Sequence, residues 1–93
     1  MVVVLGKVSV IGEELTFPNT DFRKKNLILE TLETKTPYSV DFSNDKIDLL
    51  KDVSVGDFVR VEYYVRGNYD KKIPEVAYNS FEGKSLKDII IQE

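Results

Sequence analysis

The residues of this sequence best suited to binding a ligand are basic and aromatic, and several of them stand next to one another. The run Phe22-Arg23-Lys24-Lys25 is the densest positive cluster, and Lys71-Lys72 lies close behind Tyr69. Positive groups attract phosphates and aromatic rings accept stacked bases, which are the two requirements for binding a single-stranded nucleic acid. We therefore predict nucleic-acid contacts, with basic residues at phosphates and aromatic residues stacking on bases, from Phe22, Arg23, Lys24, Lys25, Arg60, Tyr64, Arg66, Tyr69, Lys71 and Lys72.

Each of these groups also has a purely structural interpretation. The two basic clusters are compatible with solvated loop charge, and Arg66 is compatible with an ion pair to a loop carboxylate. Phe58 and Tyr64 fall on the outward face of a predicted strand, where a helix or another subunit could cover them. The sequence alone leaves both interpretations open.

Several classes of chemistry are excluded by what the sequence lacks. It contains no cysteine and no histidine, which removes disulfides, thiolate catalysis, histidine bases and zinc sites of the usual kind. Asp41, Ser43 and Asp45 resemble the first ligands of a calcium loop, but Lys46 occupies the position where that loop requires glycine. We therefore expect a protein without catalytic residues, metal ions or cofactors, and not an enzyme.

The length and composition predict one domain that spans residues 1–93. Apolar residues make up 42% of the chain and charged residues 31%, which is typical of a folded soluble protein. The opening MVVVLG lacks the basic start of a signal peptide, so we expect a cytoplasmic protein. The net charge of −3 weighs against a nucleic-acid partner unless the cations and rings share one side and the carboxylates lie elsewhere.

Alternating apolar residues predict five short strands. Gly6 interrupts the first and suggests a bulge there. In the second, Leu27 and Leu29 face inward, and in the fourth Val59, Val61, Tyr63 and Val65 share the inward face. Gly83 is expected to end the fifth strand, after which Ser85–Gln92 either extends it or forms a separate edge. The predicted strands are residues 2–11, 21–34, 38–42, 58–66 and 75–81.

A short helix is predicted between the third and fourth strands. Ile47, Leu49 and Leu50 supply its apolar face, and Asn44 or Asp45 is expected to cap its first turn. Gly56 provides the positive φ needed for the turn into the fourth strand. Five strands with one helix at this place favour an all-β fold, namely a five-stranded barrel of the OB type. A sandwich would need about seven strands, and an SH3-like barrel usually has its helix later.

Several segments together resemble a group of small bacterial and phage proteins that look like OB-fold single-stranded-DNA-binding proteins. The most distinctive run is Tyr78-Asn79-Ser80-Phe81, and the chain departs from the group by having Asn68-Tyr69 where an Arg and a Trp are usual. The resemblance implies an OB-fold module of the kind used in replication and repair. The matching segments are RKKNLILET, TPYSVDF, DKIDLL, VGDFVRVEYYVRG and AYNSFEGK.

We accordingly expect a module that binds single-stranded DNA, or RNA, with little sequence preference, and that forms a homo-oligomer such as a dimer or tetramer. The alternative belongs to another class: an OB-fold protein-interaction or oligomerisation module that binds no nucleic acid. In that alternative, Phe58, Tyr64 and the run Ile89–Ile91 form a protein interface.

Overall fold

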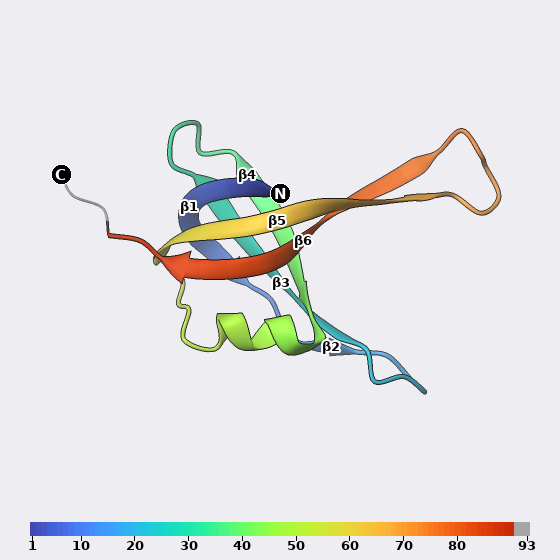
Figure 1. The fold of residues 1–93 in the computed structure, drawn as a ribbon, viewed down its shortest axis with the longest axis horizontal. Helices are drawn as coiled ribbons and strands as arrows, with labels where there is room; N and C mark the ends of the chain where they lie inside the picture. The colour runs from blue at the N-terminus through green and yellow to red at the C-terminus, as the bar shows by residue number, and fades with distance from the viewer. Residues whose placement is uncertain (91–93) are drawn as a thin grey trace.

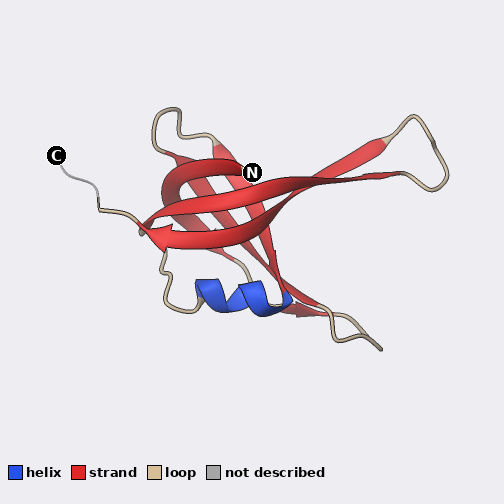
Figure 2. Cartoon of the chain, viewed as in Figure 1, coloured by secondary structure: helices blue, strands red, loops and turns tan. Residues whose placement is uncertain are grey.

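The chain folds mostly into β-strands with one short helix, as seen in a computed structural model that describes residues 1–90 (Figures 1 and 2). The strands form a single six-stranded sheet in the order β1-β5-β6-β4-β3-β2. A 3₁₀-helix, η1, lies between β4 and β5, where the sequence predicts a short helix. The elements are β1 (Val2–Ile11), β2 (Leu15–Thr16), β3 (Arg23–Thr31), β4 (Pro37–Ser43), η1 (Asn44–Leu50), β5 (Phe58–Tyr69) and β6 (Ala77–Asp88).

The pairing of five of the strands forms a closed circuit that begins and ends at β1. β1 pairs with both β5 and β3, so that β1, β3, β4, β6 and β5 each pair with two other strands of this set. The pairing of β4 with β6 is parallel, at Val40 with Phe81 and at Asp41 with Glu82. The other pairings are antiparallel. Figure 1 shows the strands curving around a common interior, with η1 below them.

The interior is filled by the residues that the alternation predicts. Leu27, Leu29, Val59 and Val61 are fully buried, and Tyr63 is nearly so. The ring of Tyr63 lies 4.7 Å from the ring of Phe81 between centroids and 6.2 Å from that of Tyr38. Apolar burial of this kind contributes about 25 cal/mol per Å², and it fixes which face of each strand points inward. The core cluster comprises Val4, Val8, Leu27, Leu29, Val40, Phe42, Ile47, Leu50, Val59, Val61 and Tyr63.

The predicted helix cap is wrong, because neither Asn44 nor Asp45 caps η1. Ser43 holds the N-cap position, and it makes no side-chain capping bond. Asn44 has a positive φ of 52°, and its Oδ1 accepts the backbone N–H of Arg23 at 3.2 Å. The side chain that was expected to cap the helix therefore connects it to β3. Ile47 and Leu50 are buried as predicted, and Gly56 has the expected positive φ of 98°.

Two glycines act differently from the prediction. β6 does not end at Gly83 but continues to Asp88. The glycine at this position instead leaves space for the ring of Phe42. The register irregularity of β1 lies between Val8 and Val10, not at Gly6, and it leaves Val10 exposed. The two-residue β2, which adds a sixth strand, is also missing from the prediction. Two residues carry too little periodicity to be recognised in a loop of turn-forming residues.

The distal halves of β5 and β6, residues 64–82, form a hairpin that we call the arm. At its base, Phe81 and Glu82 still pair with β4, and beyond them the arm projects from the body as two strands. Its strands remain paired from Tyr64 opposite Glu82 to Tyr69 opposite Ala77. Val65, predicted to face inward, is 53% exposed because no other layer covers the arm at that position. Figure 1 shows the arm leaving the body at the upper right.

The C-terminal segment extends the last strand and forms no separate edge. Lys87 and Asp88 pair with β5, and the N–H of Ile89 donates to the carbonyl oxygen of Phe58 at 2.9 Å. Ile91, the last residue of the predicted Ile89–Ile91 interface, lies outside the described residues. Across residues 1–90, no helix has the length and hydrophobicity needed to cross a lipid bilayer.

Replacement of Gly6 by alanine is predicted to destabilise the fold. An added Cβ would lie 2.5 Å from the backbone carbonyl oxygen of Glu30, which cannot move without disturbing the β1–β3 pairing. Overpacking of this kind costs roughly 1–3 kcal/mol, to be measured by urea unfolding. Gly67→Ala is the matched control, since its Cβ would lie 3.1 Å from the exposed Asn79 side chain and 3.8 Å, an ordinary contact distance, from the carbonyl oxygen of Tyr78. Equal stability of the two variants would contradict the prediction.

Candidate nucleic-acid interface

One face of the arm brings together aromatic and basic side chains. In the β5–β6 register, Arg66 lies opposite Ser80 and Asn68 opposite Tyr78. Directly opposite residues of an antiparallel pair share a face, as do residues two apart on one strand. Tyr64, Arg66 and Tyr78 therefore lie on the same face, which we call the outer arm face. Tyr78 is absent from the predicted site, although its position in the distinctive run Tyr78–Phe81 was a signal for it.

The outer arm face is accessible and carries Arg66, with Lys84 next to its Tyr64. Tyr64 is 39% exposed and Tyr78 is 59% exposed. The ammonium of Lys84 lies 5.9 Å from the centroid of the Tyr64 ring, a cation–π distance. Within residues 1–90, neither Arg66 nor Lys84 forms an ion pair with a carboxylate. Both charges thus remain accessible to an anionic ligand.

Tyr69 lies on the opposite face of the arm from Tyr64. Their sequence positions differ by five, an odd number, so the alternation of the strand separates them. Tyr69 is 79% exposed and, with Gly67 and Ala77, lines a shallow hollow. Lys71 and Lys72 follow it in the loop at the tip, where both are exposed. The tip thus carries two further cations, and its ring lies on the face opposite the outer arm face.

Asp70 holds the tip of the arm in shape. Its Oδ1 accepts the backbone N–H groups of Lys72 at 2.8 Å and Ile73 at 2.9 Å, and its Oδ2 accepts the hydroxyl of Tyr78 at 2.9 Å. These bonds, the two backbone ones foremost, hold the pKa of Asp70 below its ordinary value of 3.8. The acidic residue beside the two lysines therefore has a structural role that also orients Tyr78.

The first basic cluster, Phe22–Lys25, is partly neutralised by neighbouring groups. The guanidinium of Arg23 lies 3.6 Å from Glu14 and donates to the carbonyl oxygen of Asn44 at 3.4 Å. The Lys24 ammonium lies 4.0 Å from Asp41 Oδ2. Lys25 is half-buried and points to the other side of β3 from Lys24. Phe22 remains 37% exposed, with its ring 5.3 Å from that of Phe17.

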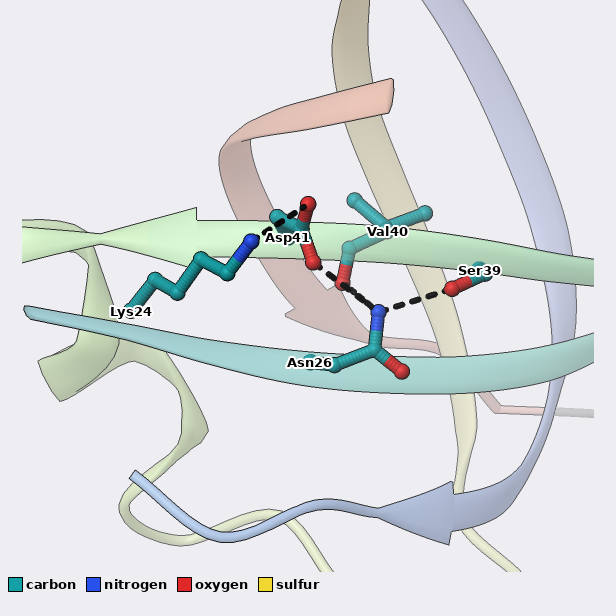
Figure 3. A network of polar contacts seen from close by, with 5 residues as sticks. All are labelled: Lys24, Asn26, Ser39, Val40 and Asp41. Atoms are coloured by element: carbon teal, nitrogen blue, oxygen red, sulfur yellow. Dashed lines mark hydrogen bonds and ion pairs between the residues drawn. The ribbon is translucent and has the colours of Figure 1, made fainter. Parts of the chain in front are cut away.

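The outward face of β3 and β4 carries a polar network that includes carboxylates (Figure 3). Asn26 Nδ2 lies 2.7 Å from Ser39 Oγ, 3.0 Å from Asp41 Oδ1 and 3.3 Å from the carbonyl oxygen of Val40. Glu82 of β6 is next to Asp41 in the parallel register and is largely buried. The requirement that carboxylates lie elsewhere is not met on this face. On the outer arm face it is met only between Glu82, which lies opposite Tyr64, and Asp70, which contacts Tyr78.

Arg60 is separated from the other predicted residues. Its guanidinium lies 3.2 Å from Glu62 Oε1, and the hydroxyl of Ser85 donates to the same oxygen at 2.9 Å. The Ser85 bond and the Arg60 bond lower the pKa of Glu62 from its ordinary value. Arg60 pairs in register with Leu5 and Lys87, and β1 and β6 separate its strand from β3 and β4.

The structure thus brings the predicted residues into two groups. One is the arm with its tip, and the other is the Phe22–Lys25 segment at the start of β3. Figure 1 shows the arm and the loop that precedes β3 projecting at the same end of the molecule, above and below one another. In the part of the chain that the structure describes, no cluster of three or more acidic residues is arranged to bind a metal ion.

Removal of the Asp70 carboxylate is predicted to loosen the tip without unfolding the body. In Asp70→Ala, the amides of Lys72 and Ile73 lose their acceptor and should exchange with solvent faster, as measured by hydrogen exchange. Folding lowers the pKa of Asp70 from its ordinary value of 3.8, so these bonds stabilise the tip at pH values above 3.8. This stabilisation is lost as the pH falls through the lower pKa that Asp70 has in the folded protein. Amides of Leu27 and Val61 serve as controls. Unchanged exchange at the tip would contradict this role.

The sequence of the chain matches the model of a protein family. A family model described as a domain of unknown function, DUF3127, matches residues 3–83, from β1 to Gly83 in β6. The comparison with curated proteins gave no match. The matched segment includes β3, η1 and the whole arm, and it covers most of the chain. The chain therefore belongs to the DUF3127 family.

Proposed function

We propose that the chain is a single OB-fold domain that binds single-stranded DNA, or RNA, without catalysis and with little sequence preference. The strand circuit β1-β3-β4-β6-β5-β1 with its one parallel pairing supports a five-stranded OB-type barrel, and so does the helix between β4 and β5. Nucleic acids usually lie on the face of the second and third strands of such a barrel, between two flanking loops. In this chain, those strands are β3 and β4, and the flanking elements are the loop before β3 and the arm.

The observation that carries the proposal is the outer arm face. It combines exposed Tyr64 and Tyr78 with Arg66 and Lys84, and these two cations make no ion pair within residues 1–90. Covering an exposed aromatic ring with a ligand removes apolar area from water, which is favourable. Base stacking on an aromatic ring contributes roughly 1–3 kcal/mol and is largely independent of the base. The face therefore offers the two interactions that sequence-tolerant binding requires.

The distribution of charge suggests how a strand would lie. Asp41 and Glu82 would repel phosphates from the middle of the β3–β4 face. Arg66, Lys71 and Lys72 on the arm offer cations to the phosphates, as do the basic residues at the start of β3. We therefore propose that the sugar–phosphate backbone follows the arm and the Phe22–Lys25 segment, while bases turn toward the sheet.

Loss of the two tip lysines is predicted to weaken binding and to flatten its salt dependence. Each lost phosphate contact should make the negative slope of log K against log salt shallower by roughly 0.7, because fewer counterions are released. The measurement is the fluorescence anisotropy of a labelled oligo-dT of about 16 nucleotides, titrated with Lys71→Gln/Lys72→Gln between about 50 and 200 mM salt. Lys46→Gln/Lys51→Gln, in and just after η1, removes the same charge as a control. Equal slopes for both double variants would place the contacts elsewhere, and no binding by the unmodified protein at low salt would reject the proposed function.

A second function, protein interaction without nucleic acid, is favoured by the start of β1. Val3 and Leu5 lie on its outward face and are 42% and 43% exposed. Pairing with β3 begins only at Gly6, although the carbonyl oxygen of Leu5 still accepts the N–H of Leu32 at 3.3 Å. An uncharged strand edge of this kind can add a strand from another chain. Phe58, named above for such an interface, lies near Lys7, whose ammonium is 5.9 Å from its ring centroid.

Light scattering combined with an oligonucleotide titration separates the two functions. Under the second function, the protein forms a tight oligomer that has no affinity for oligo-dT, and Leu5→Glu converts it to monomers because a charge would be buried at the edge. Under the first function, Leu5→Glu leaves oligo-dT affinity within about twofold, since Leu5 lies on β1, apart from the arm. A monomer that binds oligo-dT contradicts the second function.

A further inference from the structure

The orientation of the Asn26 side chain is fixed by its surroundings (Figure 3). Its amide nitrogen faces three oxygen atoms, those of Ser39 Oγ, the Val40 carbonyl and the Asp41 carboxylate, at 2.7–3.3 Å. Rotating the amide by 180° would bring Oδ1 against a carbonyl and a carboxylate, neither of which can donate a hydrogen bond. The amide therefore uses its two hydrogens within the protein and leaves its oxygen outward.

That oxygen is a hydrogen-bond acceptor without a partner among the described residues. Asn26 lies on the outward face of β3, opposite Asp41 in the β4 register. Beside it, Ile28 is opposite Ser39 and is only half-buried, which gives a small apolar surface against which a flat ring can lie. The hydroxyl of Ser39 keeps its own hydrogen and can rotate to donate it. A fixed acceptor thus stands next to an adaptable donor.

The local charge decides which part of a nucleotide fits here. Asp41 accepts from Asn26 with one oxygen and lies 4.0 Å from the Lys24 ammonium with the other, and Glu82 adjoins it in register. A phosphate at this place would meet Asp41 and Glu82, with the nearby Lys24 already paired to Asp41, whereas the amino group of a base would meet the acceptor oxygens of Asn26 and Asp41. The surface therefore suits a base edge rather than the backbone.

We infer that Asn26 selects, at one position of the bound strand, a base whose Watson–Crick edge presents an exocyclic amino group beside an acceptor ring nitrogen, cytosine or adenine, over thymine. This inference rests on the proposed nucleic-acid function. The amino group of cytosine donates to Asn26 Oδ1, and the neighbouring ring nitrogen accepts from the Ser39 hydroxyl. Thymine presents a carbonyl oxygen where cytosine presents its amino group, so two acceptors would face one another. The preference for cytosine over thymine comes from the fixed amide of Asn26, because the Ser39 hydroxyl can rotate to donate to or accept from either base.

The test compares labelled oligo-dC and oligo-dT of equal length by fluorescence anisotropy, because both are pyrimidine strands. The unmodified protein should bind oligo-dC about fivefold more tightly or better. An oligonucleotide in which pyrimidin-2-one replaces cytosine lacks only the amino group, and it should lose most of this advantage without any change to the protein. Asn26→Ala should remove the advantage and leave the affinity for oligo-dT within about twofold. Asn79→Ala, an exposed asparagine on the arm, is the matched control and should keep the advantage.

The outcomes distinguish this inference from the function on which it rests. Equal affinity of the unmodified protein for oligo-dC and oligo-dT overturns the selection by Asn26 but leaves binding to nucleic acid intact. A preference for oligo-dC that survives in Asn26→Ala, or that the pyrimidin-2-one strand retains, also overturns it. Binding of neither oligonucleotide rejects the proposed function, and the inference with it.

Discussion

The contact between Gly83 and Phe42 is the constraint on which the arrangement of this molecule depends. Phe42 is fully buried, and its ring occupies the space that any side chain at position 83 would need. This fit lets β6 approach β4 closely enough to pair in parallel at Val40 and Asp41. Because β6 also pairs with β5 along its whole length, the contact fixes the arm relative to the β3–β4 face. Both parts of the candidate interface are therefore positioned by one packing interaction.

Four carboxylates of this acidic chain have basic or hydrogen-bonding partners within the fold. Glu14, Asp41 and Glu62 each lie within 4.0 Å of a basic side chain, and Asp70 accepts hydrogen bonds from the tip of the arm. These acidic groups are thus engaged in maintaining the structure. Surface ion pairs contribute little stability, about 0–1 kcal/mol each, so their larger effect is on where unpaired charge remains. Arg66 and the tip lysines are among the charged side chains that form no ion pair within residues 1–90.

The arm owes its shape to local bonds more than to burial. A two-stranded hairpin is marginally stable alone, and Val65, Tyr69 and Tyr78 are largely exposed. Its strands are joined by continuous pairing from Tyr64 to Tyr69, and Asp70 closes the tip. The side chains that could bind a ligand therefore stand on the least buried part of the fold, as is common for binding elements positioned by a rigid body.

The sequence alone determined which face of each strand turns inward, because alternation in Leu27, Leu29, Val59 and Val61 allows only one face to be buried, but it did not show that the core ends before Val65. It also placed the short helix between β4 and β5. Only the tertiary structure decided which strands became neighbours, and hence that Asp41 and Glu82 lie side by side and that Arg60 lies apart from Lys24. It also decided the direction of the Asn26 amide, which depends on oxygens of another strand. Local periodicity predicts the side of a strand on which a residue lies. Contacts between strands depend on packing between residues far apart in the sequence, such as Phe42 and Gly83, and no short stretch of sequence contains both partners.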